Sequence, residues 1–249
     1  MCGRFTLKTD PKLIAAQFNV NALAVKDESL SDLSSPIVPS SLNAPSSLNA
    51  LSSIKPNFNV APTHKIPAIL ATSDQIVMAN FSWGLVPSWA KDPAIGSRMI
   101  NARSETVAEK PSFRSALNHR RCIVPADGWY EWQNLAGKKR PHYFSAVDDS
   151  LIGFAGIYES WNDPTGNVLW TVSILTQPAK PEFSEVHDRM PVLVAPELMQ
   201  VWLSAQNQPL AQILESSTQV AQIQHWEVSP AVGNVRNNSA DLTIKQLSI

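Results

Sequence analysis

The stretch of sequence that decides the fold runs Arg120-Arg121-Cys122-Ile123-Val124-Pro125-Ala126-Asp127-Gly128-Trp129-Tyr130-Glu131-Trp132. Two short apolar runs flank Asp127-Gly128, a pair of residues typical of turns. Runs of this kind, rich in Val, Ile and aromatic residues and bounded by Pro, Gly, Asn or Asp, indicate β-strands. The predicted strands are Cys122–Val124, Gly128–Trp132, Ile66–Ala71, Gln75–Phe81, His142–Val147, Leu151–Tyr158, Val168–Thr176 and Pro191–Val194.

Helical signals are fewer and shorter. Asp10-Pro11 has the form of an N-cap followed by a proline in the first turn, which predicts a helix to about Val20. Helical patterns also fit residues 106–118, 196–203 and 210–219. Strands and helices do not alternate regularly, so a doubly wound sheet is excluded. The predicted class is α+β, with a mainly antiparallel β-sheet or barrel core and flanking short helices.

The length and composition favour one domain. The chain has 249 residues, and its 44% of hydrophobic residues and eight Trp suffice for a sizeable core. Residues 27–56 differ from the rest because they are rich in Ser, Leu, Asn and Pro and contain a tandem copy at 39–44 and 45–50. We therefore predict a single domain over 1–249 that carries a flexible low-complexity insertion at 27–56.

Charge and cysteine content limit the partners and the compartment. A formal net charge of −1 gives no global sign of a polyanion partner, so a nucleic-acid surface would have to be a local basic patch. Two distant cysteines suit a reducing compartment. The sequence has neither a secretory signal in residues 1–30 nor a membrane-spanning run. We expect a soluble cytoplasmic protein.

The first residues read Met1-Cys2-Gly3-Arg4. Removal of the initiator methionine would leave Cys2 with an α-amine and a thiol on adjacent carbons. Their reference pKa values are about 7.7–8.0 and about 8.5, so both groups are partly deprotonated near neutral pH. Such an aminothiol can attack a carbonyl with its own amine as the base, or trap an aldehyde as a five-membered thiazolidine. A cysteine at this position is also compatible with no special role.

Other candidate groups lie at strand ends and in strands. Asn101 and Arg103 are two residues apart, so in an extended segment they point to the same face. The next two residues, Ser104-Glu105, are interpreted as the start of a helix. Glu131 stands among aromatic residues, which predicts either a desolvated acid–base group or an exposed strand residue. His187-Asp188-Arg189 places an imidazole, a carboxylate and a guanidinium before a strand, which favours a site.

No metal or cofactor is predicted. The five His are scattered without ligand spacing, and no CxxC pair occurs. Cys122 lies in an apolar strand and is interpreted as an inert core thiol. Basic residues, by contrast, cluster enough to line a positive groove on a neutral protein; they are Arg98, Arg103, Arg114, Arg120, Arg121 and Lys138-Lys139-Arg140, with Arg4 and Arg189.

Several of these segments together resemble the SOS-response-associated peptidase (SRAP) family. The motifs occur in the family's order and span nearly the whole chain, apart from the insertion. They are Met1-Cys2-Gly3-Arg4-Phe5, Asn59-Val60-Ala61-Pro62, Trp83-Gly84-Leu85-Val86-Pro87, Ile100-Asn101-Ala102-Arg103-Ser104-Glu105-Thr106, Asp127-Gly128-Trp129-Tyr130-Glu131-Trp132, His187-Asp188-Arg189-Met190-Pro191 and Ala231-Val232-Gly233-Asn234.

The resemblance implies a sensor of abasic sites in single-stranded DNA. In that family the N-terminal cysteine forms a thiazolidine DNA–protein crosslink with the ring-opened sugar, and a proposed autopeptidase activity removes Met1. By similarity, the catalytic residues are Cys2, Asn101, Glu131 and His187. The residues implied in DNA binding are Arg4, Pro62, Trp89, Arg103 and Arg189. The partner expected is single-stranded DNA with abasic sites, bound covalently by a monomer, with no membrane and no cofactor, and a nucleoid location at lesions.

Two other functions compete with this interpretation. Glutamine amidotransferases also begin Met-Cys-Gly, so an N-terminal-nucleophile amidohydrolase is the enzyme alternative. Against it, the chain lacks the glutamine-pocket pattern and the synthase domain expected of such an enzyme. The second alternative is a non-covalent single-strand DNA-binding protein in which Cys2 is incidental.

Overall fold

The computed structural model describes residues 2–23, 55–72, 75–204, 210–217 and 222–246. The insertion predicted at 27–56 lies outside the described residues, except for its last two positions. None of the helices in these ranges is long and apolar enough to cross a membrane.

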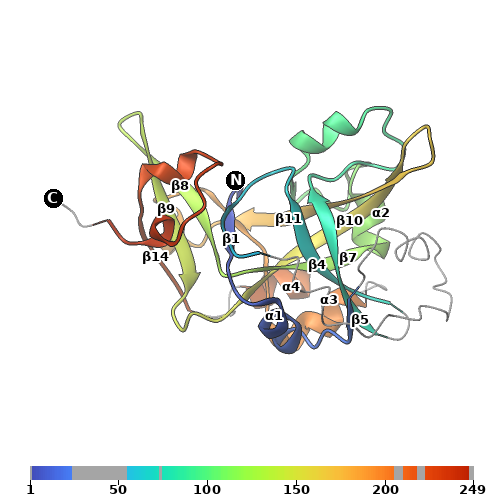
Figure 1. Ribbon diagram of the computed structural model, residues 1–249, viewed down its shortest axis with the longest axis horizontal. Helices are drawn as coiled ribbons and strands as arrows, with labels where there is room; N and C mark the ends of the chain where they lie inside the picture. Colours follow the sequence, from blue (N-terminus) through green and yellow to red (C-terminus); the bar gives the residue numbers. More distant parts are fainter. Residues whose placement is uncertain (1, 24–54, 73–74, 205–209, 218–221, 247–249) are drawn as a thin grey trace.

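The larger of two sheets closes on itself as a five-stranded barrel (Figure 1). Four of its five contacts are antiparallel, and β5 pairs with β11 in parallel. A ring of five strands cannot alternate in direction throughout, so one parallel contact is required. The barrel strands are β4 (Lys65–Ala71), β5 (Ile76–Trp83), β7 (Arg121–Ala126), β10 (Ile152–Asn162) and β11 (Val168–Pro178).

Short strands extend the edges of this barrel. On β11, β6 pairs in parallel and β12 pairs antiparallel beyond the barrel contacts. Strand β13 pairs with β10, and strand β2 pairs with β5. The four are β2 (Ala22–Leu23), β6 (Asn101–Arg103), β12 (Arg189–Pro191) and β13 (Leu193–Val194).

The second sheet is antiparallel throughout and has the order β14-β9-β8-β1-β3. Its strands are β1 (Phe5–Leu7), β3 (Asn57–Val60), β8 (Gly128–Leu135), β9 (Lys138–Ala146) and β14 (Ile223–Glu227). Both sheets together confirm the predicted α+β class with a mainly antiparallel sheet or barrel core.

The chain passes from the barrel into the second sheet at Asp127. The expected turn at Asp127-Gly128 is wrong, because β7 continues into β8 through a bend instead of reversing. The Asp127 carboxylate accepts hydrogen bonds from the Lys8 and Thr9 amides at 2.6 and 3.2 Å and from Thr9 Oγ1 at 2.5 Å. Gly128 is required here, since a Cβ atom would lie 2.3 Å from the Phe144 carbonyl oxygen.

Removing the Asp127 carboxylate is expected to destabilise the fold at this bend. Asp127→Ala removes the acceptor of the Lys8 and Thr9 amides, and a hydrogen bond to a charged group is worth on the order of 1.5–3 kcal/mol. Asp127→Asn keeps an acceptor and should lie between the alanine variant and the wild type. Urea unfolding followed by tryptophan fluorescence measures this, and equal midpoints for all three proteins would contradict the role of the bend.

The helices are short, and α2, α3 and α4 lie against strands of the larger sheet (Figure 1). The predicted N-cap is confirmed, because Asp10 Oδ1 accepts from the Lys12 amide at 2.8 Å. The helix predicted over 106–118 forms only from Arg114 onward: residues 104–109 and 111–113 are turns, because Pro111 lacks an N–H and disfavours helical geometry before it. The α-helices are α1 (Pro11–Gln17), α2 (Arg114–His119), α3 (Met199–Leu203) and α4 (Leu210–Ser217). The 3₁₀ segments are η3 (Pro93–Arg98), η4 (Pro181–Phe183), η5 (Pro196–Leu198), η6 (Pro230–Gly233) and η7 (Ala240–Thr243).

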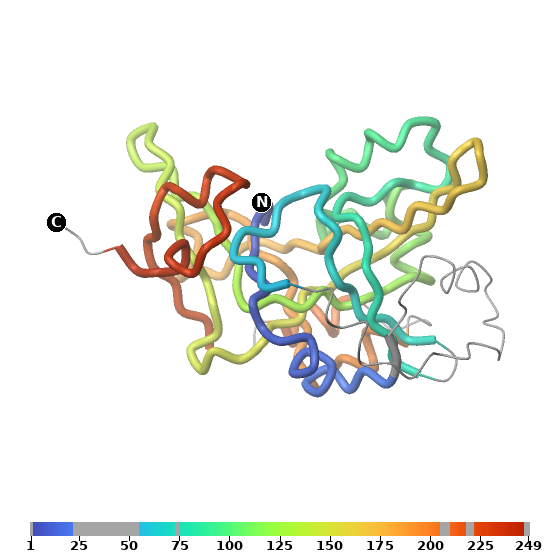
Figure 2. The backbone as a smooth tube through the Cα atoms, in the orientation of Figure 1, coloured from blue at the N-terminus to red at the C-terminus, as the bar shows by residue number. Residues whose placement is uncertain are grey.

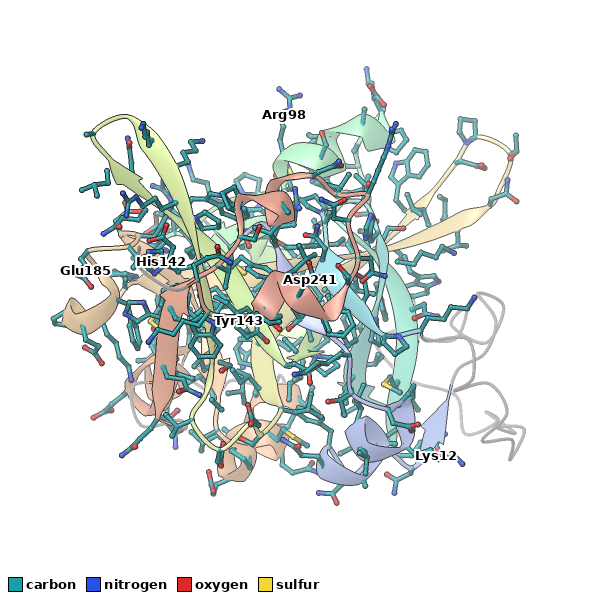
Figure 3. All side chains as sticks on the ribbon, turned by 60° about the vertical axis from the view of Figure 1, so that its left-hand side comes forward. Lys12, Arg98, His142, Tyr143, Glu185 and Asp241 are labelled. Atoms are coloured by element: carbon teal, nitrogen blue, oxygen red, sulfur yellow. The ribbon has the colours of Figure 1, made fainter. Side chains whose placement is uncertain are left out.

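Side chains of β8 and β9 alternate between two hydrophobic clusters. Trp129 and Phe144 stack at 4.9 Å within the main core. On the other face, Tyr130 and Tyr143 pack beneath the C-terminal segment in a smaller cluster with Val228, Val232 and Leu242. On β9, His142 lies on the side of Glu185 (Figure 3), whereas the neighbouring Tyr143 belongs to the cluster that contains Leu242. Cys122 is fully buried in the main core, as predicted.

Candidate active site

Strand register brings the first residues of the chain to Glu131. Phe5 lies opposite Trp129, and the Tyr130 amide donates to the Arg4 carbonyl at 3.0 Å. The same antiparallel register, continued two residues beyond Phe5, sets Gly3 opposite Glu131.

Cys2 precedes this glycine and is fully buried. Its carbonyl accepts a hydrogen bond from Asn101 Nδ2 at 2.8 Å. Burial raises the pKa of the Cys2 thiol well above its ordinary value, and the charge of Glu131 raises it further. The thiol is therefore protonated at neutral pH before a ligand arrives, and Glu131 is close enough to act on it electrostatically.

Glu131 is 2% exposed, so the interpretation as an exposed strand residue is excluded. Burial raises the pKa of its carboxyl group to about 7, although the positive charge of the amino terminus opposes this. A carboxyl group that titrates near neutral pH can both donate and accept a proton, as general acid–base catalysis requires. Its Oε2 lies 3.8 Å from His187 Nε2.

The ring nitrogen of His187 that lies toward Glu131 is Nε2. Its Nδ1 accepts a hydrogen bond from the Arg189 amide at 2.9 Å. Burial lowers the pKa of the imidazole, which is therefore neutral at pH 7 and carries its proton on Nε2, toward Glu131. Asp188 Oδ1 also lies 3.0 Å from Nδ1, a contact that becomes favourable only when His187 is protonated.

Asn101 is positioned by the edge of the barrel. It begins β6, opposite Ile174 of β11, and the preceding Ile100 carbonyl accepts from Trp83 Nε1 at 2.9 Å. The structure thus assembles Cys2, Asn101, Glu131 and His187 from four distant parts of the chain, all of them singled out in the sequence.

Of the arginines predicted to bind DNA, two are held by contacts within the chain and one is exposed. Arg189 is 9% exposed and is held by Glu105 through both terminal nitrogens and by the Thr176 carbonyl at 2.7 Å. The hydrogen bonds from Arg189 lower the pKa of the Glu105 carboxyl group to about 2. Arg4 is likewise held within the chain, whereas Arg103 is exposed.

Glu105 was expected to begin a helix, and that interpretation is wrong. Residues 104–109 form turns, and the Glu105 carboxylate pairs with Arg189 instead. Sequence reasoning could not identify this partner, because 84 positions separate the two residues.

Trp89 and Pro62 lie on surface loops. Trp89 is 61% exposed, and the loop that carries it is fixed by a 2.7 Å hydrogen bond from Trp161 Nε1 to the Ala90 carbonyl. Pro62 is half-buried in the turn after β3. Arg98 extends outward from η3 (Figure 3). An exposed indole on an anchored loop is a surface on which a base can stack.

Among the residues that the structure describes, no three His, Cys, Asp or Glu side chains are grouped so that they could hold a metal ion. One histidine pair was missed by the sequence reasoning: His142 and His225 face each other across β9 and β14 with their Nδ1 atoms 3.3 Å apart.

The chain combines a barrel joined to a second sheet with an N-terminal Cys-Gly-Arg segment beside a buried Glu. These features define the class of protein to which it belongs. The chain belongs to the SOS response associated peptidase (SRAP) family, which it matches over residues 1–235.

Named relatives cover most of the chain. It is 37% identical over 245 residues to the abasic site processing protein YoqW of Bacillus subtilis, with 97% of this chain and 98% of that protein aligned. It is 32% identical over 237 residues to the abasic site processing protein HMCES of Mus musculus, with 77% and 67% covered. A crystal structure of a Bacteroides thetaiotaomicron protein shares the fold, with a TM-score of 0.79 over 99% of this chain and 100% of that one at 23% identity.

Proposed function

We propose that this protein senses abasic sites in single-stranded DNA and captures them covalently through Cys2 after Met1 is removed. The observation that carries the proposal is that the buried Cys2 lies close enough to Glu131 to feel its charge, and that burial raises the pKa of the Glu131 carboxyl group to about 7. Relatives named abasic site processing proteins support the choice of substrate. An abasic site opens to an aldehyde, which is the group that an aminothiol traps.

The reaction begins with the amine, since the buried thiol is protonated in the resting protein. The Cys2 amine adds to C1′ of the open sugar, and loss of water from the carbinolamine leaves an imine. The thiol sulfur then adds to the imine carbon while its proton passes to the imine nitrogen, closing a thiazolidine. One water is released, and no oxidant or reductant is needed. Holding the partners together supplies the effective concentration that free cysteine lacks.

Three side chains assist these steps. Glu131, in its neutral form, protonates the hydroxyl group that leaves the carbinolamine. His187 Nε2–H assists the earlier ring opening, in which the C1′–O4′ bond breaks and the C1′ hydroxyl proton passes to O4′. Asn101 fixes the Cys2 carbonyl, and its side chain orients the sugar end.

Five residues form the proposed DNA contact surface. Arg103 and Trp89 are exposed, so the guanidinium can meet phosphate while the indole stacks on a base. Pro62, in the turn after β3, is included because the resemblance implies it in DNA binding. Arg4 and Arg189 contribute positive charge beside it while remaining bound within the chain.

The test is a gel-shift experiment with single-stranded DNA that carries one abasic site. Purified protein whose intact mass has lost one Met is expected to form a heat-stable adduct, with a mass increment equal to the DNA minus one water. DNA with a reduced, non-aldehydic site should give none. Absence of any heat-stable adduct from processed protein would reject the proposal.

The same samples separate the alternatives. An amidohydrolase would release ammonia from glutamine in a manner abolished by Cys2→Ala. A simple single-strand binding protein would hold abasic and intact DNA with equal affinity and would form no covalent product.

A further inference from the structure

Asn59 of β3 is a fully bonded, buried polar residue outside the group that performs the chemistry. It is 1% exposed. Its Oδ1 accepts from Arg4 Nη1 at 2.8 Å. Its Nδ2 lies within hydrogen-bonding distance of three backbone carbonyl oxygens, those of Val232 at 3.2 Å, Asn234 at 3.0 Å and Asn237 at 2.9 Å.

Arg4 contacts the same C-terminal segment. Its Nη1 also donates to the Val232 carbonyl at 2.9 Å and its Nη2 to the Gly233 carbonyl at 3.5 Å. Asn59 and Arg4 therefore join three parts of the chain that lie far apart in sequence. Figure 2 shows the N-terminal residues, the segment before β4 and the C-terminal segment side by side at this point.

These contacts matter because Cys2 lies two residues before Arg4, at the start of the chain after Met1 removal. Chain ends fray unless they are tied down, and β1 is only three residues long. The backbone anchors ahead of β1 are the Tyr130 amide on the Arg4 carbonyl and Asn101 on the Cys2 carbonyl. The Arg4 side chain adds an anchor that depends on Asn59.

We propose that Asn59 is a positioning residue for the aldehyde-trapping reaction: it holds the Arg4 guanidinium against residues 232–237 and so keeps Cys2 facing Asn101 and Glu131. This inference rests on the function proposed above. Arg4 thereby acts as an anchor of the reacting residue, in addition to the charge that it contributes beside the DNA.

The reaction rate is the first readout. In single-turnover reactions with abasic DNA, Asn59→Ala is expected to form the adduct about 10–100-fold more slowly at saturating DNA, because small misplacements of a reacting group have effects of that size. The DNA concentration for half-maximal rate should stay unchanged. Asn59→Asp keeps an oxygen for Arg4 but sets its second carboxylate oxygen against three backbone carbonyl oxygens, so it should also react more slowly than the wild type.

Asn238→Ala is the matched control. Asn238 Oδ1 accepts from the Phe58 amide at 2.7 Å, so this variant loosens the C-terminal segment from β3 without touching Arg4. It is expected to react at the wild-type rate. A double variant of Asn59→Ala with Arg4→Ala should be no slower than the slower single variant, as for residues that act through one another.

Hydrogen exchange gives a second readout that is independent of DNA. Peptides covering residues 2–7 should exchange faster in Asn59→Ala and remain protected in Asn238→Ala. A wild-type rate and wild-type exchange in Asn59→Ala would overturn the inference, as would equal slowing by Asn238→Ala. Failure of the wild type to form an adduct would instead reject the proposed function, while the exchange result would still decide whether Asn59 holds the terminus.

Discussion

Cys2→Ala is expected to eliminate the heat-stable adduct with abasic DNA while leaving the protein folded. The variant retains an α-amine at the same place, so it can still form the imine with C1′. It has no sulfur to close the thiazolidine, and the imine hydrolyses when the protein is denatured. Borohydride added during the reaction should therefore capture a covalent product from Cys2→Ala, although none survives heating without it.

Cys122→Ala provides the control for this experiment. Its thiol is also fully buried, and burial raises its pKa far above the ordinary value, but it lies in the barrel core away from the site. This variant should give the full heat-stable yield. A heat-stable adduct from Cys2→Ala, or its loss from Cys122→Ala without loss of folding, would contradict the role of Cys2.

Much of the fold could be predicted from the sequence because the barrel strands are long, apolar and bounded by clear breakers. The short strands around the site were not predicted. β1, β3, β6 and β14 are only three to five residues long and mix polar with apolar side chains. They exist because a neighbouring strand pairs with them, a cause that lies outside their own sequence.

The candidate site could also be predicted only in part. Residue type and resemblance identified Cys2, Asn101, Glu131 and His187, but the sequence left the environment of Glu131 open. Alternation along β8 places Glu131 on the face of Trp129, and that face is buried. The side-chain partners of Arg189 and Asn59 were not predicted either, because these side-chain hydrogen bonds connect residues between 13 and 178 positions apart.

Glu131→Gln is expected to slow adduct formation by about 10²–10⁴-fold, the usual contribution of a general acid or base. In the wild type the rate should fall at low pH, where the amine is protonated, and again as pH rises through about 7, where Glu131 loses its proton. The amide of the variant cannot titrate, so the decline on the alkaline side should disappear. Rates measured from pH 5 to 9 test this, and an unchanged alkaline decline would assign it to another group.

Glu131→Gln is expected to react more slowly than the wild type but to be more stable toward unfolding at alkaline pH. The Glu131 pKa is about 7 in the folded protein against an ordinary value of 4.5, so the folded state holds a proton that the unfolded chain releases between these values. Stability therefore falls as pH rises across this window, by on the order of 3 kcal/mol for this residue. Glu131→Gln removes that loss, so the variant should be more stable than the wild type at pH 8 and should lose its advantage by pH 4.

The two effects together distinguish a catalytic carboxyl group from a structural one. A carboxyl group that stabilised the fold would be replaced at a cost in both stability and rate. Glu131 is instead held where ionisation is unfavourable, and an amide of the same shape relieves this while losing the proton that the carbinolamine needs. Urea unfolding at pH 4 and pH 8, set beside the rates, tests the pair of expectations. Lower stability of the variant at pH 8 would mean that the Glu131 carboxylate supports the fold and does not serve proton transfer.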